Sequence, residues 1–376
     1  MTILENKSLP ESDLHPLLLL GAGHAHLVAL KLWMQRGYRA PAGSMLVSPG
    51  SRAWYSGMMP GLIAGRFDAA DCAIDLQPLC EATGLQLVES SVVAVSAAAR
   101  QVILTSGQRL AYQVLSVNTG SQPPAPLSDG SIDRVPAKPF PVFYAQWQAW
   151  LQNPPHRLVV LGGGAAAFEL ALALKKSLSG TEILLVCAAD LLSGYARGLQ
   201  KRAQSLLQQR GIELQQNIRV SSLASGVICD GERRVCEADA VVLATGAAPL
   251  PWYGDSGLSM NRQGFLRVTN ALHSIDDPSV YVSGDACSLE GNQRSGVFAV
   301  RHGPILAHNL PAALSGTSLI DYVPQKQALA LLATADGGAL LGYGRFSAGG
   351  ALARPLLGRW KDSLDLGFMR RHRLPA

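Results

Sequence analysis

The sequence lacks the cysteine patterns that hold metal clusters or form redox-active disulfide loops. Its six cysteines include no CxxC or CxxxxC pair, which argues against a zinc site and against dithiol chemistry. We therefore predict no metal site, and we expect reduced, mostly buried thiols in a cytoplasmic protein. The six are Cys72, Cys80, Cys187, Cys229, Cys236 and Cys287.

Long apolar runs and clustered charges are scarce too. Glycines and histidines interrupt the longest apolar candidate, residues 17–30, so no stretch of about 18 apolar residues could span a membrane. The first fifteen residues are polar and acidic, the reverse of a basic signal-peptide start, and we expect no export. The net charge of +5 comes without a Lys/Arg run among aromatics, which argues against nucleic acid as a partner.

Glycine and apolar residues, in contrast, are abundant. The 376 residues include 38 glycines, and they are 48% apolar but only 16% charged. This composition is typical of buried parallel sheets joined by tight turns. The chain is too long for one ordinary core, so we predict an α/β protein with two interleaved domains.

Two parts of the chain repeat the order strand, glycine-rich turn, helix, strand. Such a turn lets the backbone approach a pyrophosphate, whose charge is met by the helix N-terminus. The repeat therefore predicts two Rossmann-like dinucleotide-binding units. The four ranges are 17–20, 21–26, 27–33 and 44–48 in the first unit, and 157–161, 162–167, 168–177 and 182–187 in the second.

The first turn departs from the usual pattern of three glycines. Gly21 and Gly23 supply the first two, but His26 stands in the third place and Ser48 where an acid usually binds ribose. The second turn has Gly162 and Gly164, with Ala167 as an accepted small substitute in the third place. Cys187 stands at its ribose position, which is compatible with a pocket that tolerates a 2'-phosphate.

Both units close on a similar signature. Apolar strands at 114–117 and 240–243 each lead into a Thr-Gly pair followed by a proline, and a later strand at 280–283 leads into Gly284-Asp285. The two pairs are Thr119-Gly120 and Thr245-Gly246. Two glycine turns and three such closures together are much more specific than any one of them.

This combination resembles the flavoproteins with two dinucleotide-binding domains, the pyridine nucleotide-disulfide oxidoreductase superfamily. It includes type II NADH dehydrogenases, sulfide:quinone oxidoreductases and disulfide reductases. Four segments are most similar to one subgroup, the NADH-dehydrogenase-like module often fused to selenide, water dikinase. They are Gly21-Ala22-Gly23-His24-Ala25-His26, Tyr55-Ser56-Gly57-Met58-Met59-Pro60-Gly61, Gly296-Val297-Phe298-Ala299-Val300-Arg301 and Trp360-Lys361-Asp362.

The resemblance implies FAD in the first domain and NADH or NADPH in the second. We expect the FAD domain to comprise residues 16–122 and 249–312, with the nicotinamide domain, 123–248, inserted into it. Residues 1–15 would be a polar tail, and residues 313–376 a C-terminal region. Within the inserted part, the segment 123–155 is rich in proline and glycine breakers, and we interpret it as a crossover between the domains.

The expected cofactor contacts follow from the turns, the closures and the resemblance. For FAD they are Gly21, Gly23, His24, Ala25, His26, Ser48, Thr119, Gly120, Gly284 and Asp285. For the nicotinamide cofactor they are Gly162, Gly164, Ala165, Ala166, Glu169, Thr245 and Gly246.

Five of the candidate side chains have alternative interpretations. The resemblance implies that Asp285 binds the ribityl chain and that Glu169 faces nicotinamide and flavin. From the residues alone, Asp285 could cap a turn, and Glu169, expected in the first helical turn, could complement the helix N-terminus. Lys138 could stabilise a reduced flavin anion or be a solvated surface lysine. His24 and His26 could contact flavin or relay protons, but we favour local hydrogen bonding for both.

Three departures from these relatives concern the electron acceptor. The segment 54–65 replaces the paired-cysteine helix of disulfide reductases and contains no cysteine. Only Cys287 lies where sulfide:quinone oxidoreductases need cysteines, and we interpret it as a packing residue. Val297 and Arg301 match the positions of two glutamines in type II NADH dehydrogenases, which weakens the case for quinone.

The C-terminus has the pattern of an amphipathic helix. Leu356, Trp360, Leu364 and Phe368 recur every fourth residue. Arginine and lysine outnumber acids around them, as expected of a helix on anionic lipid at the inner face of the cell membrane. The alternative is that the two aromatic residues pack on the FAD domain. The basic residues are Arg354, Arg359, Lys361, Arg370, Arg371 and Arg373.

The leading hypothesis is an FAD-dependent NAD(P)H dehydrogenase or reductase. Hydride would pass from nicotinamide to flavin, and then to a small-molecule acceptor such as a membrane quinone. Two alternatives stay open. One is a sulfide:quinone-type flavoprotein with a vestigial nicotinamide domain, and the other is a non-catalytic partner of selenophosphate synthesis.

Overall fold

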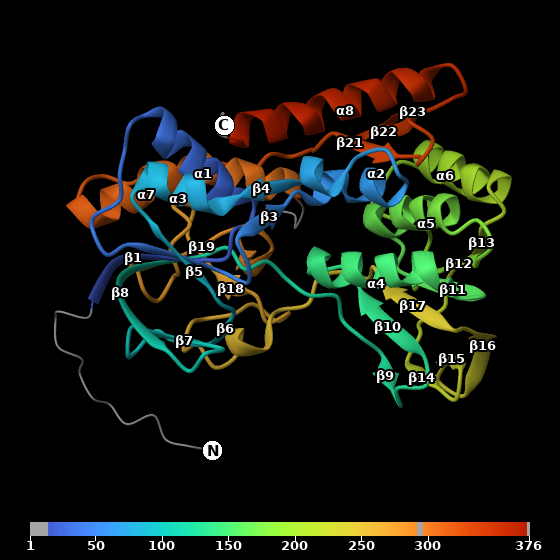
Figure 1. Ribbon diagram of the computed structural model, residues 1–376, viewed down its shortest axis with the longest axis horizontal. Coiled ribbons are helices and arrows are strands. Elements are labelled where there is room, and N and C mark those ends of the chain that lie inside the picture. Colours follow the sequence, from blue (N-terminus) through green and yellow to red (C-terminus); the bar gives the residue numbers. More distant parts are fainter. Residues whose placement is uncertain (1–13, 292–295, 374–376) are drawn as a thin grey trace.

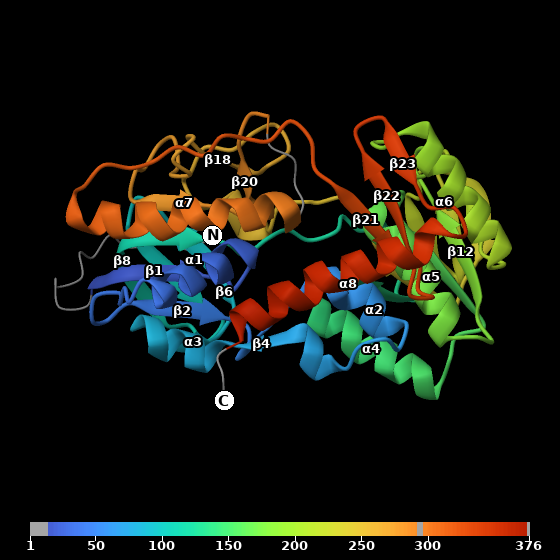
Figure 2. The ribbon, with the colours of Figure 1, turned by 90° about the horizontal axis from the view of Figure 1, so that it is seen from above.

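The computed structural model describes residues 14–291 and 296–373, which form two α/β units and a small C-terminal region (Figure 1). The units lie beside each other. Figure 2 shows helix α8 (Ala353–His372) running across both, with the antiparallel strands of the C-terminal region near its beginning. The predicted polar tail, residues 1–15, lies outside the described residues except for its last two, which belong to the first strand.

The first unit contains a parallel sheet in the order β5-β2-β1-β8-β19, to which β7 and β6 add an antiparallel edge. Leu17 to Leu20 in the central strand are almost fully buried, and because successive side chains point to opposite faces, both faces of the sheet are covered there. Helices α1, α3 and α7 cover one of these faces (Figure 1). The strands are β1 (Leu14–Leu20), β2 (Met45–Ser48), β5 (Gln86–Glu89), β6 (Val92–Ser96), β7 (Gln101–Leu104), β8 (Arg109–Val117) and β19 (Val280–Val282). The helices are α1 (His24–Gln35), α3 (Leu76–Thr83) and α7 (Gly296–Ser315).

The second unit repeats this plan with five parallel strands in the order β10-β17-β11-β12-β13. A small sheet of β9, β14, β15 and β16 lies at its lower edge (Figure 1). The strands are β9 (Leu127–Ser128), β10 (Asp133–Pro136), β11 (Arg157–Leu161), β12 (Glu182–Val186), β13 (Glu213–Gln215), β14 (Ser222–Ala224), β15 (Val227–Asp230), β16 (Arg233–Glu237) and β17 (Ala240–Leu243). The helices are α4 (Phe140–Gln152), α5 (Ala165–Ser177) and α6 (Arg197–Gln209).

The C-terminal region is an antiparallel sheet of three strands followed by α8. These strands are β21 (Ala330–Ala333), β22 (Ala339–Tyr343) and β23 (Phe346–Ala348). The short elements elsewhere are β3 (Arg52–Trp54), β4 (Ala73–Asp75), β18 (Leu266–Arg267), β20 (Cys287–Ser288), α2 (Met59–Ile63), and the 3₁₀ helices η2 (Ser56–Met58), η3 (Ala69–Cys72), η4 (Pro251–Tyr253) and η5 (Gly284–Ala286).

The α/β fold class with two Rossmann-like sheets is confirmed, and the strands 157–161 and 240–243 have the predicted bounds. The crossover 123–155 is more ordered than we expected, because it contains α4 and two strands. The prolines of this segment predicted breaks, but two of them stand at the start of a helix. Pro139 is the residue before α4 and Pro141 lies in the first turn of α4, where the missing N–H costs nothing. Trp147 and Trp150 of α4 are buried in the core.

In the part of the chain that the structure describes, no helix combines the length and the apolar character that crossing a bilayer would require. The predicted C-terminal helix is present as α8, but only part of its apolar stripe is buried. Phe368 is buried, whereas Leu356, Trp360 and Leu364 are 64%, 43% and 49% exposed. The packing alternative, which concerned Trp360 and Phe368, therefore holds for Phe368, whereas Trp360 is only partly buried.

Candidate dinucleotide sites and the cleft between them

The first glycine turn joins the end of β1 to the start of α1. Gly21 adopts φ +82°, and a Cβ there would lie 2.7 Å from the carbonyl oxygen of Asn118, so the turn needs glycine for conformation and for space. Helix α1 starts after Gly23 without any side-chain cap. In its first turn the N–H of His26 donates to Asn118 Oδ1, and the N–H groups of His24 and Ala25 are the donors that an anion such as pyrophosphate could use.

The second turn has the same construction. Gly162 adopts φ +146°, and its Cβ would lie 2.2 Å from the carbonyl oxygen of Ala244, the residue before the Thr-Gly closure. Helix α5 also starts without a side-chain cap, after Gly164, whose Cβ would meet nothing within 4 Å. Cys187 is fully buried, and its thiol donates to the Gly162 carbonyl at 3.3 Å, while burial raises its pKa to about 12. This thiol offers no charged group to a ribose.

A cleft of about 1050 Å³ opens between the two units and beneath α8. Eight of the predicted residues line it, from both units, whereas the glycines of the two turns are not among its lining residues. Ser48, Ala25 and His26 are buried in the first unit and do not line the cleft. The eight are His24, Lys138, Ala165, Ala166, Glu169, Thr245, Gly246 and Asp285.

Asp285 is an ion-paired carboxylate in this cleft. It accepts hydrogen bonds from Lys138 Nζ at 2.8 Å and from Ser121 Oγ at 3.2 Å. Burial alone would raise the pKa of Asp285, but the charge and hydrogen bond of Lys138 and the bond from Ser121 outweigh it and leave that pKa lowered. Lys138 is therefore an ion-pair partner at the cleft wall, although its side chain is half exposed, and Asp285 is ionised near neutral pH.

Glu169 lies in the cleft wall, but not in the first turn of the helix as we predicted. It is the fifth residue of α5, beyond the first turn, and its Oε1 accepts the backbone N–H of Ala333 on β21 at 2.6 Å. The alternative role at the helix N-terminus is therefore wrong, because its hydrogen bond goes to another element. Burial raises the pKa of Glu169 to about 7, even though Lys361 and the Ala333 N–H favour the charged form.

Helix α8 adds a buried polar group to the cleft that sequence reasoning missed. Lys361 Nζ donates to Asp365 Oδ2 at 2.8 Å and to the Gly57 carbonyl at 2.9 Å. The Tyr55 hydroxyl donates to the other Asp365 oxygen at 3.1 Å. Tyr55 and Lys361 belong to segments that carried the family resemblance, which was the only sequence signal for them.

His24 also faces the cleft, among aromatic rings. Its ring centroid lies 5.3 Å from that of Tyr55 and 6.0 Å from that of Phe368. Burial lowers the pKa of His24 to about 4, and the charge of Lys138 adds to this effect. The imidazole is therefore neutral at physiological pH. We had favoured local hydrogen bonding for His24, and that role does not explain why its ring lies in the cleft wall.

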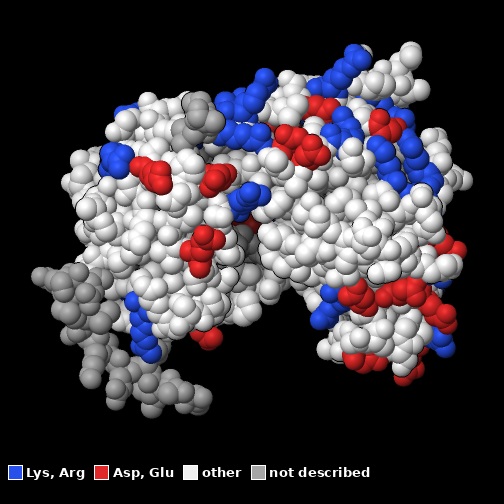
Figure 3. All heavy atoms as spheres, viewed as in Figure 1, with Lys and Arg blue, Asp and Glu red and all other residues white. Residues whose placement is uncertain are grey.

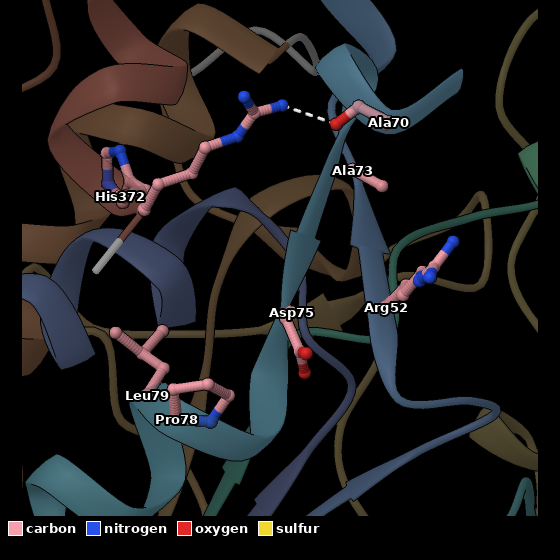
Figure 4. A pocket seen from close by; sticks show the side chains of 8 residues that line it. Arg52, Ala70, Ala73, Asp75, Pro78, Leu79 and His372 are labelled. Atoms are coloured by element: carbon pink, nitrogen blue, oxygen red, sulfur yellow. Dashed lines mark hydrogen bonds between the residues drawn. The ribbon is translucent and has the colours of Figure 1, made fainter. Parts of the chain in front are cut away.

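A smaller pocket of about 260 Å³ lies between β3, β4, α3 and the end of α8 (Figure 4). Arg52, Asp75 and His372 line it, and the Arg373 guanidinium donates to the Ala70 carbonyl. None of the predicted cofactor contacts belongs to this pocket.

Comparisons with known proteins agree with this fold. A family model described as pyridine nucleotide-disulphide oxidoreductase matches residues 16–309, which is most of the chain. The protein called ferroptosis suppressor protein 1 from Taeniopygia guttata is 26% identical over 252 residues, which are 63% of this chain and 66% of that protein. The match thus spans just under two thirds of that relative's length.

Two solved structures share the fold across both units. The sulfide:quinone oxidoreductase from Aquifex aeolicus matches with a TM-score of 0.75 at 14% identity, covering 95% of this chain and 91% of that one. The water-forming NADH oxidase from Lactobacillus brevis, bound to NADH, matches with a TM-score of 0.71 at 18% identity, covering 88% and 75%. At these identities the likeness concerns the fold.

Proposed function

The chain belongs to the pyridine nucleotide-disulphide oxidoreductase family, and from this premise we propose that it is an FAD-dependent oxidoreductase that uses NADH or NADPH to reduce a small-molecule acceptor. One observation carries the proposal: two uncapped, glycine-lined helix N-termini serve the two sides of one cleft, with an ionised Asp285 on one side and Glu169 on the other.

The residues of the first unit fit FAD. Its pyrophosphate would meet the N–H groups at the start of α1, and Asp285 would accept hydrogen bonds from its hydroxyl-bearing chain. The second turn would hold the nicotinamide cofactor in the same way, so that the two reacting rings share the cleft. When bound, FAD supplies the redox chemistry, accepting hydride from the nicotinamide and passing electrons to the acceptor.

The chain's own side chains position these groups and handle the proton. Lys138 and Ser121 keep Asp285 ionised and oriented. Glu169, with a pKa of about 7, holds or releases a proton close to neutral pH, which suits an acceptor that takes up a proton with its electrons. Phe368 and Tyr55 line the cleft and stack on each other with their ring centroids 4.5 Å apart, which gives this part of its wall an apolar surface.

Anaerobic mixing tests the proposal. We expect protein loaded with FAD to lose its yellow colour when NADH or NADPH is added, and to regain it with a suitable acceptor. Retention of the oxidised spectrum with both nicotinamides would contradict the proposal. Rapid bleaching by sulfide or a selenium hydride without any response to nicotinamide would instead favour the sulfide:quinone-type alternative. The observation that motivates it is the lack of an acid at both ribose positions, where Ser48 and Cys187 stand.

The acceptor and the partners are finer proposals. A quinone acceptor is compatible with the relatives named above. The case for it is weakened because Val297 and Arg301 stand where type II NADH dehydrogenases carry two glutamines. The link to selenide, water dikinase rests on the four similar segments alone, as does the non-catalytic alternative. FAD-free protein that binds the dikinase normally, with no turnover in the FAD-loaded protein, would support that alternative.

We further propose that α8 rests on an anionic membrane surface. Leu352, Leu356 and Trp360 project apolar surface from its outer side, with Leu352 92% exposed. Figure 3 shows Lys and Arg side chains gathered along the edge formed by α8 and α6, with a few acids between them. Apolar contact combined with basic charge is the signature of interfacial binding.

Vesicle flotation tests the membrane contact. We expect weak binding to anionic vesicles at low salt, and loss of binding at high salt, because screening acts over about 10 Å at 0.1 M. Replacing Leu352 and Leu356 by Asp should weaken binding on the order of tenfold or more, at about 1.4 kcal/mol per tenfold. Leu127→Asp is the control, because Leu127 is 79% exposed on β9, at the opposite edge of the molecule (Figure 1). Equal flotation of all three proteins would exclude this role for α8.

A further inference from the structure

The side chain of Asn118 joins the two loops of the first unit that would contact FAD. Asn118 follows β8 and is 4% exposed. Its Oδ1 accepts the backbone N–H of His26 in the glycine turn at 3.3 Å, and its Nδ2 donates to the Ser283 carbonyl at 3.0 Å, directly before Gly284 and Asp285. One amide therefore connects the start of α1 to the loop that carries the cleft carboxylate.

The glycines around this amide leave it no spare room. A Cβ at Gly23 would lie 2.3 Å from Asn118 Oδ1, and a Cβ at Gly284 would lie 2.7 Å from Asn118 Nδ2. Both loops thus pack directly against the two ends of the side chain. The glycines at these positions serve the amide as well as a close approach of cofactor.

The His26 ring completes the connection. Its Nδ1 lies 2.6 Å from the Gly21 carbonyl oxygen, and its Nε2 lies 2.8 Å from Ser116 Oγ on β8. Because a carbonyl can only accept, Nδ1 carries the proton and Nε2 accepts from the serine. Burial lowers the pKa of His26 to about 4, in spite of the Gly21 carbonyl, so the ring is neutral. The residue that breaks the three-glycine pattern therefore ties the turn to the central sheet.

The second unit has no equivalent connection at these two positions. Ala244 precedes its Thr-Gly closure and Ala167 takes the third place of its turn, and neither side chain can hydrogen-bond. The Cys187 thiol, at 3.3 Å from the Gly162 carbonyl, is the counterpart of the His26 bond to Gly21. The two turns thus share their backbone plan and differ in how firmly side chains fix them.

We propose that Asn118 and His26 are positioning residues that lock the first turn to the loop 283–285, so that FAD is retained through many turnovers while the second turn exchanges its nicotinamide. The inference rests on the proposed function. Its physical basis is preorganisation: a site already held in its binding geometry loses less entropy on binding, and the gain shows mainly as slower release.

The test is the rate of FAD release, followed by the fluorescence of free FAD after dilution. Asn118→Ala and His26→Gly should each release FAD about tenfold to a hundredfold faster than wild type, since each leaves buried partners without a hydrogen bond. The glycine-motif view predicts the opposite for His26→Gly, which restores the usual third glycine. His26→Asn, whose Nδ2 can replace Nδ1 at the Gly21 carbonyl, should recover part of the loss.

Cys187→Ala is the matched control, because the Cys187 thiol bonds the Gly162 carbonyl of the second turn, and its FAD release should equal that of wild type. The KM for NAD(P)H should not change in the Asn118 or His26 variants that retain FAD. FAD release from Asn118→Ala and His26→Gly at the wild-type rate would overturn the inference. A wild-type protein that takes up no FAD would contradict the proposed function itself, so the two failures are distinguishable.

Discussion

Gly164→Glu is expected to abolish reduction by NADH and NADPH while leaving FAD bound. Gly164 is the residue before α5, where the N–H groups of the first turn would meet the nicotinamide pyrophosphate. A carboxylate there would occupy the anion position and repel the phosphates. Because a Cβ at this position meets nothing within 4 Å, the substitution is compatible with the fold.

The expected loss in the second-order rate constant for flavin reduction is on the order of a hundredfold or more, at about 1.4 kcal/mol per tenfold. Stopped-flow absorbance with each nicotinamide measures it, and the flavin content of the purified variant is measured in parallel. Gly180→Glu is the matched control, because Gly180 lies beyond the other end of α5 and also has free space around its Cβ. Loss of FAD from the Gly164 variant, with no change in the rate for protein that retains it, would reverse the assignment of the two turns.

Lys361→Met is expected to lower the free energy of unfolding by about 3 kcal/mol or more. The side chains of Lys361 and Asp365 are only 13% and 9% exposed, so the substitution leaves a buried carboxylate without its cation. It also removes the charge that favours ionised Glu169. In this variant the pKa values of Asp365 and Glu169 should rise. Ionising either carboxyl group in the folded protein then lowers the free energy of unfolding as the pH rises through its folded pKa.

Urea unfolding at about pH 5 and about pH 8 tests the sign as well as the size of this effect. The deficit should be smaller at the lower pH, where protonation relieves both carboxyl groups. Arg66→Met is the control, since Arg66 forms an ion pair with Asp362, the residue of α8 that follows Lys361. The side chains of Arg66 and Asp362 are 23% and 22% exposed. A more solvated pair should cost about 1 kcal/mol or less. Equal losses in both variants, independent of pH, would contradict a buried charge network at Lys361.

The local elements of the fold were predictable because their signals lie within a few residues. Strands β11 and β17 are short apolar runs bounded by turn residues, and both have the bounds expected from the sequence. Helix α4 shows where such signals conflict. Its aromatic residues have helical spacing, but its prolines were read as breakers, although proline favours the first turn of a helix.

The candidate site was predictable only in part. The turns around Gly21 and Gly162 and the Asp285 loop follow from motifs, and Glu169 from the family resemblance. Single motifs did not predict the roles of side chains whose partners lie far away in the sequence. His26 was compared with a missing glycine, whereas its ring bonds Ser116, 90 residues away. Lys138 was weighed as a surface lysine, whereas its partner is Asp285, 147 residues away.

By itself, the sequence determined the repeated strand-turn-helix plan, the two glycine turns and the absence of a paired-cysteine motif. These depend on backbone conformation and periodicity, which neighbouring residues specify. Only the tertiary structure decided that Tyr55 would meet Asp365, 310 residues later, and that α8 would place Lys361 beside Glu169. It likewise decided that Asn118 would bond both to His26, 92 residues before it, and to Ser283, 165 residues after it. The physical reason is that these contacts form where separate elements pack together, and no local pattern specifies which polar side chains then face one another.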